Sequence, residues 1–179
     1  MLLLNTNPAG PAAPEIFAPC PARPVITLNP DGFDDWPCLL GLLRHAFAHT
    51  VGKVDPPSTV YACTAADLAQ RAKREHLMVA ADGIRLAGCL FLKETGHELF
   101  LGRFAIRNEY KGGGLARRMI RHAAELARQR GKSTLVLETR TALTGNQAKF
   151  RALGFQITGG RAHAGYQGIT TFRMARRVD

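Results

Sequence analysis

The chain of 179 residues is 46% hydrophobic and 21% charged, which is the composition of one ordinary globular domain able to bury a core. Its formal net charge of +10 indicates an anionic partner, and a nucleic acid, a membrane surface or a phosphorylated cofactor would each satisfy that charge. The four cysteines are scattered without a C-x-x-C pair, which argues against a zinc site and a disulfide framework and favours a reducing cytoplasm.

A flexible tail rich in proline and alanine is predicted over residues 1–23, ahead of one folded domain over residues 24–179. Six of the ten prolines lie in residues 1–24, and proline neither pairs in a central strand nor continues a helix. The apolar residues 1–4 are too short for a signal sequence, and no apolar run of about 18 residues occurs elsewhere. We therefore expect a protein that is neither secreted nor membrane-spanning.

The folded part is predicted to begin with a short strand over 24–28 and a helix that runs to about residue 49. Asp34 or Asp35 would cap this helix, Pro37 fits its opening turn, and its buried stripe is Leu39, Leu40, Leu43 and Phe47. Thr64 would cap a second helix that ends at about residue 74.

A hairpin is predicted next, with strands 77–81 and 84–93 joined by the two-residue turn Asp82-Gly83. Gly96 then turns the chain into a strand over 99–106. An amphipathic helix, a strand over 135–140, a further helix and two last strands follow. Asn146 lies near the start of that further helix and would cap it. This order predicts an α/β domain with a mixed, mostly antiparallel sheet.

The centre of the chain is a glycine turn that leads into the amphipathic helix, in the segment 110–120. Glycines let the backbone come close to a ligand, and the unpaired N–H groups of the first helical turn attract a negative group. The segment therefore predicts an anion site, with a pyrophosphate as the expected ligand. Two common phosphate loops do not fit. Leu126 stands where a Walker loop ending in Gly131-Lys132-Ser133 needs glycine, and Arg117 stands at the third glycine of G-x-G-x-x-G.

Residues 111–116, Lys-Gly-Gly-Gly-Leu-Ala, resemble motif A of the GNAT superfamily of N-acetyltransferases, R/Q-x-x-G-x-G/A, with lysine at the first position. Downstream, the strand over 135–140 and a helix ending in Leu153-Gly154-Phe155 resemble the next motif of that family. The resemblance implies a sheet of six to seven strands flanked by helices. It also implies that the strands over 99–106 and 135–140 lie parallel and splay apart to hold acetyl-CoA.

The same resemblance implies the cofactor-binding residues. The pantetheine arm would pair with backbone groups of the first splayed strand, and the glycine loop would hold the phosphates. The expected set is Phe104, Ala105, Ile106, Lys111, Gly112, Gly113, Gly114, Leu115, Ala116, Arg117, Asn146, Lys149 and Phe150.

Glu138 and Tyr166 are the leading candidates for catalysis. Glu138 is the candidate base, since this stretch is similar to ribosomal-protein alanine N-acetyltransferases, where a glutamate at the matching place has that role. The alternative is a structural ion pair with Arg140, two residues along the same strand. The family's tyrosine acid falls at Phe150, which has no proton to give, so Tyr166, His163 or water would protonate the departing thiolate.

The predicted function is direct, acetyl-CoA-dependent transfer of an acetyl group to a primary amine of a small molecule or peptide. An acyl-CoA sensor without catalysis and a basic nucleic-acid-binding module are the alternatives. No metal is expected, since His45 and His49 have no third ligand nearby, and nucleic acid is disfavoured because aromatic residues make up only 7% of the chain. A homodimer is compatible with the resemblance, and the acceptor is left open.

Overall fold

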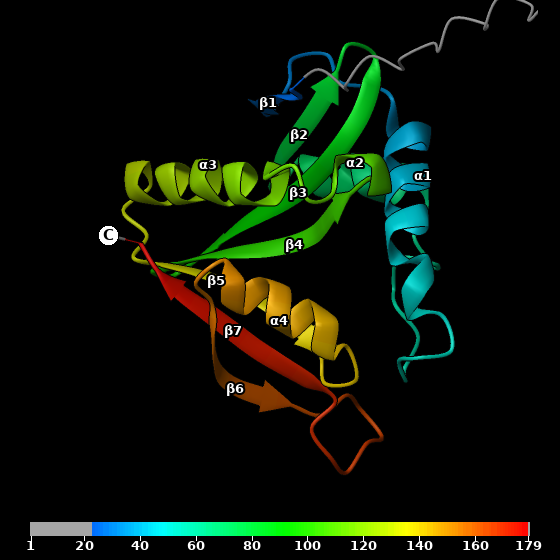
Figure 1. Cartoon of the computed structure of the whole chain (residues 1–179), viewed down its shortest axis with the longest axis vertical. Coiled ribbons are helices and arrows are strands. Elements are labelled where there is room, and N and C mark those ends of the chain that lie inside the picture. The colour runs from blue at the N-terminus through cyan, green and yellow to red at the C-terminus, as the bar shows by residue number, and fades with distance from the viewer. Residues whose placement is uncertain (1–22, 179) are drawn as a thin grey trace, which may run out of the picture.

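The computed structural model describes residues 23–178, so most of the predicted tail over residues 1–23 lies outside the described residues. Seven strands form one sheet in the order β1-β2-β3-β4-β5-β7-β6, and four α-helices flank it (Figure 1). Among the described strands, only β4 and β5 pair in parallel. The predicted mixed, mostly antiparallel sheet with one parallel pair is therefore confirmed.

The N-terminal half contributes an antiparallel meander and two helices. Its elements are β1 (Val25–Leu28), α1 (Trp36–Phe47), η1 (Ala48–Thr50), α2 (Ala65–Ala72), β2 (His76–Asp82), β3 (Arg85–Thr95) and β4 (Glu98–Ile106). Asp35 caps α1 by accepting a hydrogen bond from the backbone N–H of Cys38, and Pro37 lies in the first turn as predicted. Thr64 and Asp67 form a reciprocal capping box at α2.

The C-terminal half contains the motifs that the sequence singled out. Its elements are η2 (Asn108–Tyr110), α3 (Leu115–Gln129), β5 (Thr134–Arg140), α4 (Thr144–Ala152), β6 (Gln156–Arg161) and β7 (Thr171–Arg177). The strand, glycine loop and helix around residues 98–129 follow one another as predicted.

Two details of the prediction are wrong. The hairpin turn is Gly83-Ile84 rather than Asp82-Gly83, since Asp82 still pairs with Arg85 in the ladder and accepts a hydrogen bond from the Tyr110 hydroxyl. Gly83 takes the first turn position with φ +57°. In α1 the buried leucines are Leu39, Leu42 and Leu43, so Leu42 replaces Leu40 in the stripe and Phe47 is only half-buried.

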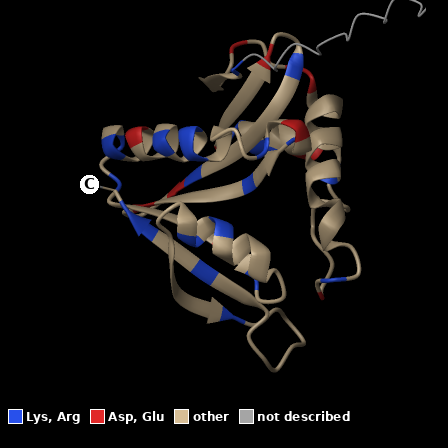
Figure 2. Cartoon of the chain, in the orientation of Figure 1, with Lys and Arg blue, Asp and Glu red and all other residues tan. Residues whose placement is uncertain are grey.

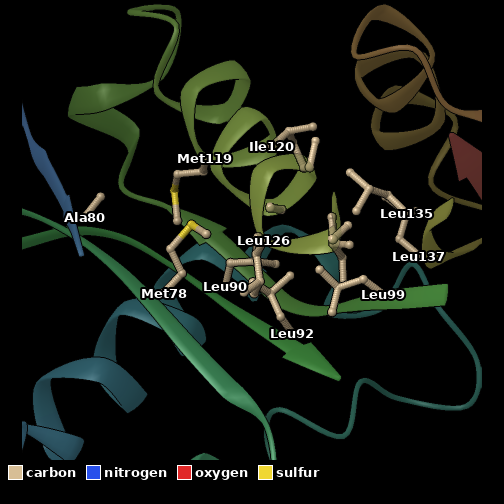
Figure 3. Close-up of a cluster of buried hydrophobic side chains, with 14 of the residues drawn as sticks. Met78, Ala80, Leu90, Leu92, Leu99, Met119, Ile120, Leu126, Leu135 and Leu137 are labelled. Carbon is tan, nitrogen blue, oxygen red and sulfur yellow. The ribbon is translucent and has the colours of Figure 1, made fainter. Parts of the chain in front are cut away.

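Two hydrophobic clusters lie on opposite faces of the sheet, because side chains alternate along each strand. In β2, Met78 and Ala80 join the cluster under α3, whereas Leu77 and Val79 join the cluster under α1 and α2. Figure 3 shows Met119, Ile120 and Leu126 of α3 packed on the first of these faces. The two layers of helices thus fix the sheet from both sides and position the edges of the gap described next.

Candidate active site

The candidate site begins where β4 and β5 stop pairing. Their parallel ladder runs from Glu98↔Thr134 to Leu101↔Leu137 and contains no later pair, so the two strands diverge beyond that point. A β-bulge in β4 lies at the same place, because Gly102 pairs with Phe91 whereas Ala105 pairs with Cys89. Arg103, within the bulge, has φ +52°. The bulge frees the backbone of residues 104–106 to face the gap instead of β5.

A cavity of about 510 Å³ lies in this gap, between the end of β4, the glycine loop and α4. Every residue of the predicted cofactor set except Gly113 lines it: Phe104, Ala105, Ile106, Lys111, Gly112, Gly114, Leu115, Ala116, Arg117, Asn146, Lys149 and Phe150. The structure therefore brings together residues that are up to 46 positions apart in the sequence, from Phe104 to Phe150. Phe47, His49 and Tyr110 also line the cavity and were not predicted for it.

The glycine loop has the geometry of an anion site at a helix N-terminus. Gly112 and Gly114 adopt the left-handed conformation, with φ +82° and +77°, and Gly114 is the N-cap of α3. A Cβ atom at either glycine would meet no heavy atom within 4 Å, so the loop surface is open to a ligand. Lys111, Arg117 and Lys149 add positive charge around the same cavity. These features fit the pyrophosphate of coenzyme A.

Two basic residues near the glycine loop make contacts within the protein. The Arg118 guanidinium donates to the carbonyl oxygen of Pro24 at 2.7 Å, and burial lowers its pKa, so it is held by β1 rather than turned to the loop. The Lys111 ammonium donates to the Asn108 side-chain oxygen at 2.6 Å at the rim of the cavity. Figure 2 shows the band of basic residues along α3, beside the glycine loop.

Asn146 and Phe150 lie on α4 and line both this cavity and its neighbour. Asn146 was expected to cap α4, but the helix begins at Thr144 with Leu143 as N-cap and no side-chain cap, so that interpretation is wrong. The Phe150 ring packs against the rings of Phe104 and Phe155, at centroid distances of 6.4 Å and 6.0 Å. At the place of the family's tyrosine, Phe150 thus forms an apolar wall.

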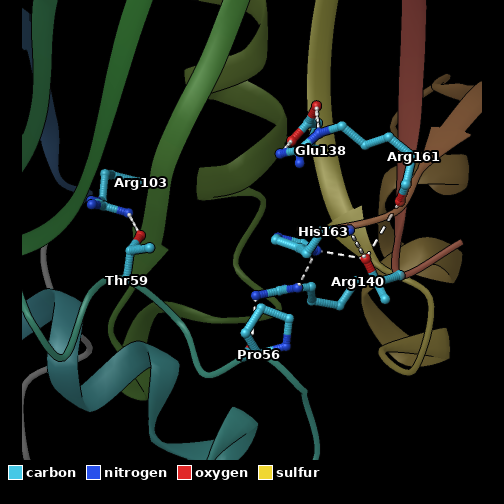
Figure 4. A network of polar contacts seen from close by, with 8 residues as sticks. Pro56, Thr59, Arg103, Glu138, Arg140, Arg161 and His163 are labelled. Carbon is cyan, nitrogen blue, oxygen red and sulfur yellow. Dashed lines mark hydrogen bonds and ion pairs between the residues drawn. The ribbon is translucent and has the colours of Figure 1, made fainter. Parts of the chain in front are cut away.

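The second cavity, of about 310 Å³, adjoins the first and shares Phe47, Phe104, Asn146 and Phe150 with it. Glu138 of β5 lines this second cavity and forms an ion pair, but with Arg161 rather than with Arg140. Arg161 Nε and Nη2 lie 3.0 Å and 2.7 Å from the two carboxylate oxygens (Figure 4). The β6–β7 hairpin brings Arg161 to this place, since Arg161 pairs with Thr171 and Thr171 pairs with Arg140.

Arg140 lines the same cavity and contacts two neutral groups. Its Nη2 donates to the carbonyl oxygen of Pro56 at 2.6 Å, and its Nη1 lies 2.9 Å from Nδ1 of His163 (Figure 4). Burial and the charges of Arg140 and Arg161 hold the pKa of His163 below its ordinary value of 6.5. A neutral imidazole accepts the Arg140 hydrogen bond at Nδ1, which is consistent with that direction.

Of the two candidate acids, His163 lines the second cavity and Tyr166 does not. Tyr166 is in the β6–β7 connection and lines neither cavity, and a hydrogen bond with Asp55 raises its pKa. Its ring centroid is 6.5 Å from that of His163, which does line the second cavity. Glu98, at the far end of β4, is paired with Arg173. Within residues 23–178 no group of three or more His, Cys, Asp or Glu side chains is placed to hold a metal ion.

The sequence profile described as the acetyltransferase (GNAT) family matches residues 41–155. The chain belongs to this family. N-acetyltransferase 8F1 from Rattus norvegicus is 34% identical over 64 residues, which are 36% of this chain and 29% of that protein. The chain thus matches less than a third of the length of this curated relative.

Solved structures of acetyltransferases share the fold. PaiA N-acetyltransferase from Thermoplasma acidophilum, in complex with coenzyme A, has a TM-score of 0.70 at 15% identity, covering 86% of this chain and 99% of that chain. The ribosomal-protein-S18-alanine N-acetyltransferase from Escherichia coli has a TM-score of 0.63 at 18% identity, covering 86% and 94%. The parallel β4–β5 pair and flanking helices therefore correspond to the GNAT fold. No helix within residues 23–178 is long and apolar enough to cross a membrane.

Proposed function

We propose that this GNAT-family chain is an acetyl-CoA-dependent N-acetyltransferase that moves the acetyl group directly to a primary amine of a small molecule or peptide. One observation carries the proposal. The cavity lined by the predicted cofactor residues adjoins, at four shared lining residues, a second cavity that is lined by the Glu138 carboxylate. A thioester held in the first cavity would meet an amine held in the second at Phe104, Asn146 and Phe150.

The chain's own contribution to such a reaction is mainly positional. Acetyl-CoA, when bound, supplies the activated acetyl group. Holding an amine against it replaces a bimolecular encounter and can supply roughly 7 to 11 kcal/mol of the barrier. No cysteine among the described residues lines either cavity, which favours direct transfer over an acyl-enzyme.

We propose Glu138 as the base that takes the proton from the attacking ammonium. Its carboxylate lines the second cavity, which we call the acceptor cavity, and its bidentate pair with Arg161 fixes its position. Water is the proton source that we propose for the departing thiolate, because Tyr166 lines neither cavity. Tyr166 as the acid stays a prediction, to be tested with Tyr166→Phe.

Steady-state release of coenzyme A, followed with a thiol reagent over a panel of amines, tests these roles. Loss of a general base lowers the rate by about 100-fold or more, so Glu138→Gln should reduce kcat to that extent while the KM for acetyl-CoA stays unchanged. Arg161→Gln is the matched variant, because it removes the same ion pair and keeps the carboxylate.

The two variants separate the catalytic role from a structural one. If Glu138 is the base, Arg161→Gln should keep most of the wild-type kcat, whereas Glu138→Gln should lose it. If both variants lower the melting temperature alike and change kcat by no more than a few-fold, Glu138 is a structural ion-pair partner. Binding of acetyl-CoA without turnover of any amine would favour the acyl-CoA sensor.

A further inference from the structure

The acceptor cavity has an unbalanced charge, and this imbalance bears on the substrate of the proposed function. Three arginines line it, namely Arg103, Arg140 and Arg161, whereas Glu138 is the only carboxylate among the described residues that line it. Arg161 donates two hydrogen bonds to the Glu138 carboxylate, so the charges of these two residues cancel. The positive charge that remains in the lining belongs to Arg103 and Arg140.

Within residues 23–178, no carboxylate lies within ion-pair distance of Arg140. Its two contacts are a carbonyl oxygen, that of Pro56, and the imidazole nitrogen of His163. A guanidinium has five N–H donors in a fixed fork, so three donors of Arg140 are not used by these contacts. The half-buried Arg140 side chain therefore keeps its charge in the cavity lining, with donors that no described residue occupies.

Arg103 lines the opposite wall, on the β4 bulge. Its Nη1 donates to the Thr59 hydroxyl at 3.1 Å (Figure 4), and its buried Nε has no hydrogen-bond partner among residues 23–178. In Figure 4 the Arg103 side chain turns toward Thr59 and away from Arg140, so Arg140 is the better-placed ligand residue. Arg103 adds positive potential to the same cavity.

Burial lowers the pKa of both Arg103 and Arg140, which means that each cation lacks solvation that a counterion would replace. Around Arg140, the charge of Arg161 acts in the same direction, while Tyr166, Asp55 and Glu138 oppose it. Of these groups, Glu138 is bound to Arg161, and Asp55 lies beyond ion-pair distance of Arg140. A ligand with its own negative charge would complete the balance.

The volume of the cavity, about 310 Å³, is at the lower end of the range for small-molecule sites. We propose that the acceptor is a small amine that also carries a carboxylate or phosphate, and that Arg140 binds this oxyanion. Bidentate hydrogen bonds from a guanidinium suit either group. The inference rests on the proposed acetyl transfer and specifies its acceptor.

The experiment compares matched acceptors with saturating acetyl-CoA. The pairs are amino acids against their carboxamides, and ethanolamine phosphate against ethanolamine. Since a hydrogen bond to a charged group is worth a tenfold change or more, kcat/KM should be at least about tenfold higher for the charged member of a pair. The two pairings distinguish carboxylate from phosphate.

Arg140→Gln should abolish this preference by raising the KM of the charged acceptor, while the neutral acceptor is unaffected. Arg140→Lys, which keeps the charge, should restore part of the preference. The matched control is Arg177→Gln, an exposed residue at the opposite end of β7, where it pairs with Thr134. A merely structural Arg140 would lower kcat/KM for both members alike, and that result overturns the inference.

Equal or better turnover of the neutral amines would also overturn it. If acetyl-CoA binds but no acceptor in the panel is turned over, calorimetric titration of the N-acetylated products into the protein with coenzyme A replaces the kinetic readout. Preferential binding of the charged products supports the inference, and absence of that preference contradicts it. Failure of acetyl-CoA itself to bind would instead remove the proposed function on which the inference rests.

Discussion

At the scale of single residues, Gly113 and Gly114 of the glycine loop can be compared, because they differ in backbone conformation. Gly114 has φ +77°, where an L side chain is strained, whereas Gly113 lies between two left-handed glycines without sharing their conformation. Neither position is crowded, since a Cβ at Gly113 would lie 3.8 Å from the Tyr110 carbonyl oxygen and one at Gly114 would meet nothing within 4 Å. The cost of a side chain here is therefore conformational.

Gly114→Ala should lower the free energy of unfolding by about 1 to 2 kcal/mol, because alanine must adopt the left-handed conformation. Gly113→Ala should change it by about 0.5 kcal/mol or less, or raise it slightly through the reduced entropy of the unfolded chain. Urea denaturation of the protein without cofactor measures both. Equal destabilisation by the two substitutions would contradict the conformational explanation.

His163 predicts a pH effect at the acceptor cavity. Its pKa in the folded protein is held below 6.5, so the unfolded chain binds its proton more readily as the pH falls. The stability that this histidine contributes is fully present above pH 6.5 and is lost as the pH drops through the lower folded value. Between pH 7 and pH 5, the wild-type protein should therefore lose more stability than His163→Gln, as measured by denaturation at each pH. A parallel pH dependence of the two proteins would show that His163 is not perturbed.

Residue chemistry that depends on contiguous sequence could be predicted, whereas pairings across strands could not. The glycine loop and the apolar stretch of β4 are each recognisable from a few consecutive residues. Their cavity-lining residues could therefore be predicted from the family resemblance. Arg161 is 23 residues from Glu138 and reaches it only because β6 folds back along β7. Thr59 and Pro56 lie in a loop with no distinguishing pattern, so their contacts with Arg103 and Arg140 had no signal in the sequence.

At the scale of elements, β3 packs closely against the part of β4 that borders the proposed cofactor site. A Cβ at Gly88 would lie 3.0 Å from the Ala105 carbonyl oxygen and 3.3 Å from the Met119 sulfur. Ala105 is one of the residues expected to pair with the pantetheine arm. Gly88 therefore permits the close approach of β3 to the bulged part of β4.

Gly88→Ala should destabilise the protein by about 1 kcal/mol or more through overpacking, and should weaken acetyl-CoA binding by displacing Ala105. Gly159→Ala in β6 is the matched control, since a Cβ there would meet nothing within 4 Å. Thermal denaturation and acetyl-CoA titration of both variants provide the comparison. Unchanged affinity in a folded Gly88→Ala protein would show that the Ala105 backbone does not contribute to binding.

Element boundaries show where local signals were sufficient. The caps at Asp35 and Thr64 could be predicted from the sequence, because a capping side chain bonds to the first turn of the helix that directly follows it. The hairpin turn was misplaced by one residue because the contact that holds Asp82 in the strand comes from Tyr110, beyond β4. The predicted cap at Asn146 was wrong because α4 begins two residues earlier, at Thr144. There the Gln147 amide ties the helix to the Arg140 and Thr141 carbonyl oxygens.

At the scale of the whole molecule, the sheet has two halves, one made of β1–β4 and the other of β5–β7. The short parallel ladder between β4 and β5 joins them (Figure 1). The ladder closes one end of the gap, and the divergence beyond it opens the cavity. Contacts such as Arg140 with the Pro56 carbonyl and Glu98 with Arg173 also link the two halves. A cofactor between the strands would add contacts to both halves, so binding should stabilise the folded chain as a unit.

The most direct test of the account is a thermal-shift titration of the whole chain with acetyl-CoA, with coenzyme A and ATP as comparisons. A ligand that binds only the folded state adds about 2.7 kcal/mol to its stability at 100 times its Kd. We expect a saturable rise in melting temperature with acetyl-CoA and coenzyme A, none with ATP, and a smaller rise for Gly114→Ala than for the wild-type protein. No shift at millimolar acetyl-CoA, or an equal shift with ATP, would contradict the assignment of the β4–β5 gap as the cofactor site.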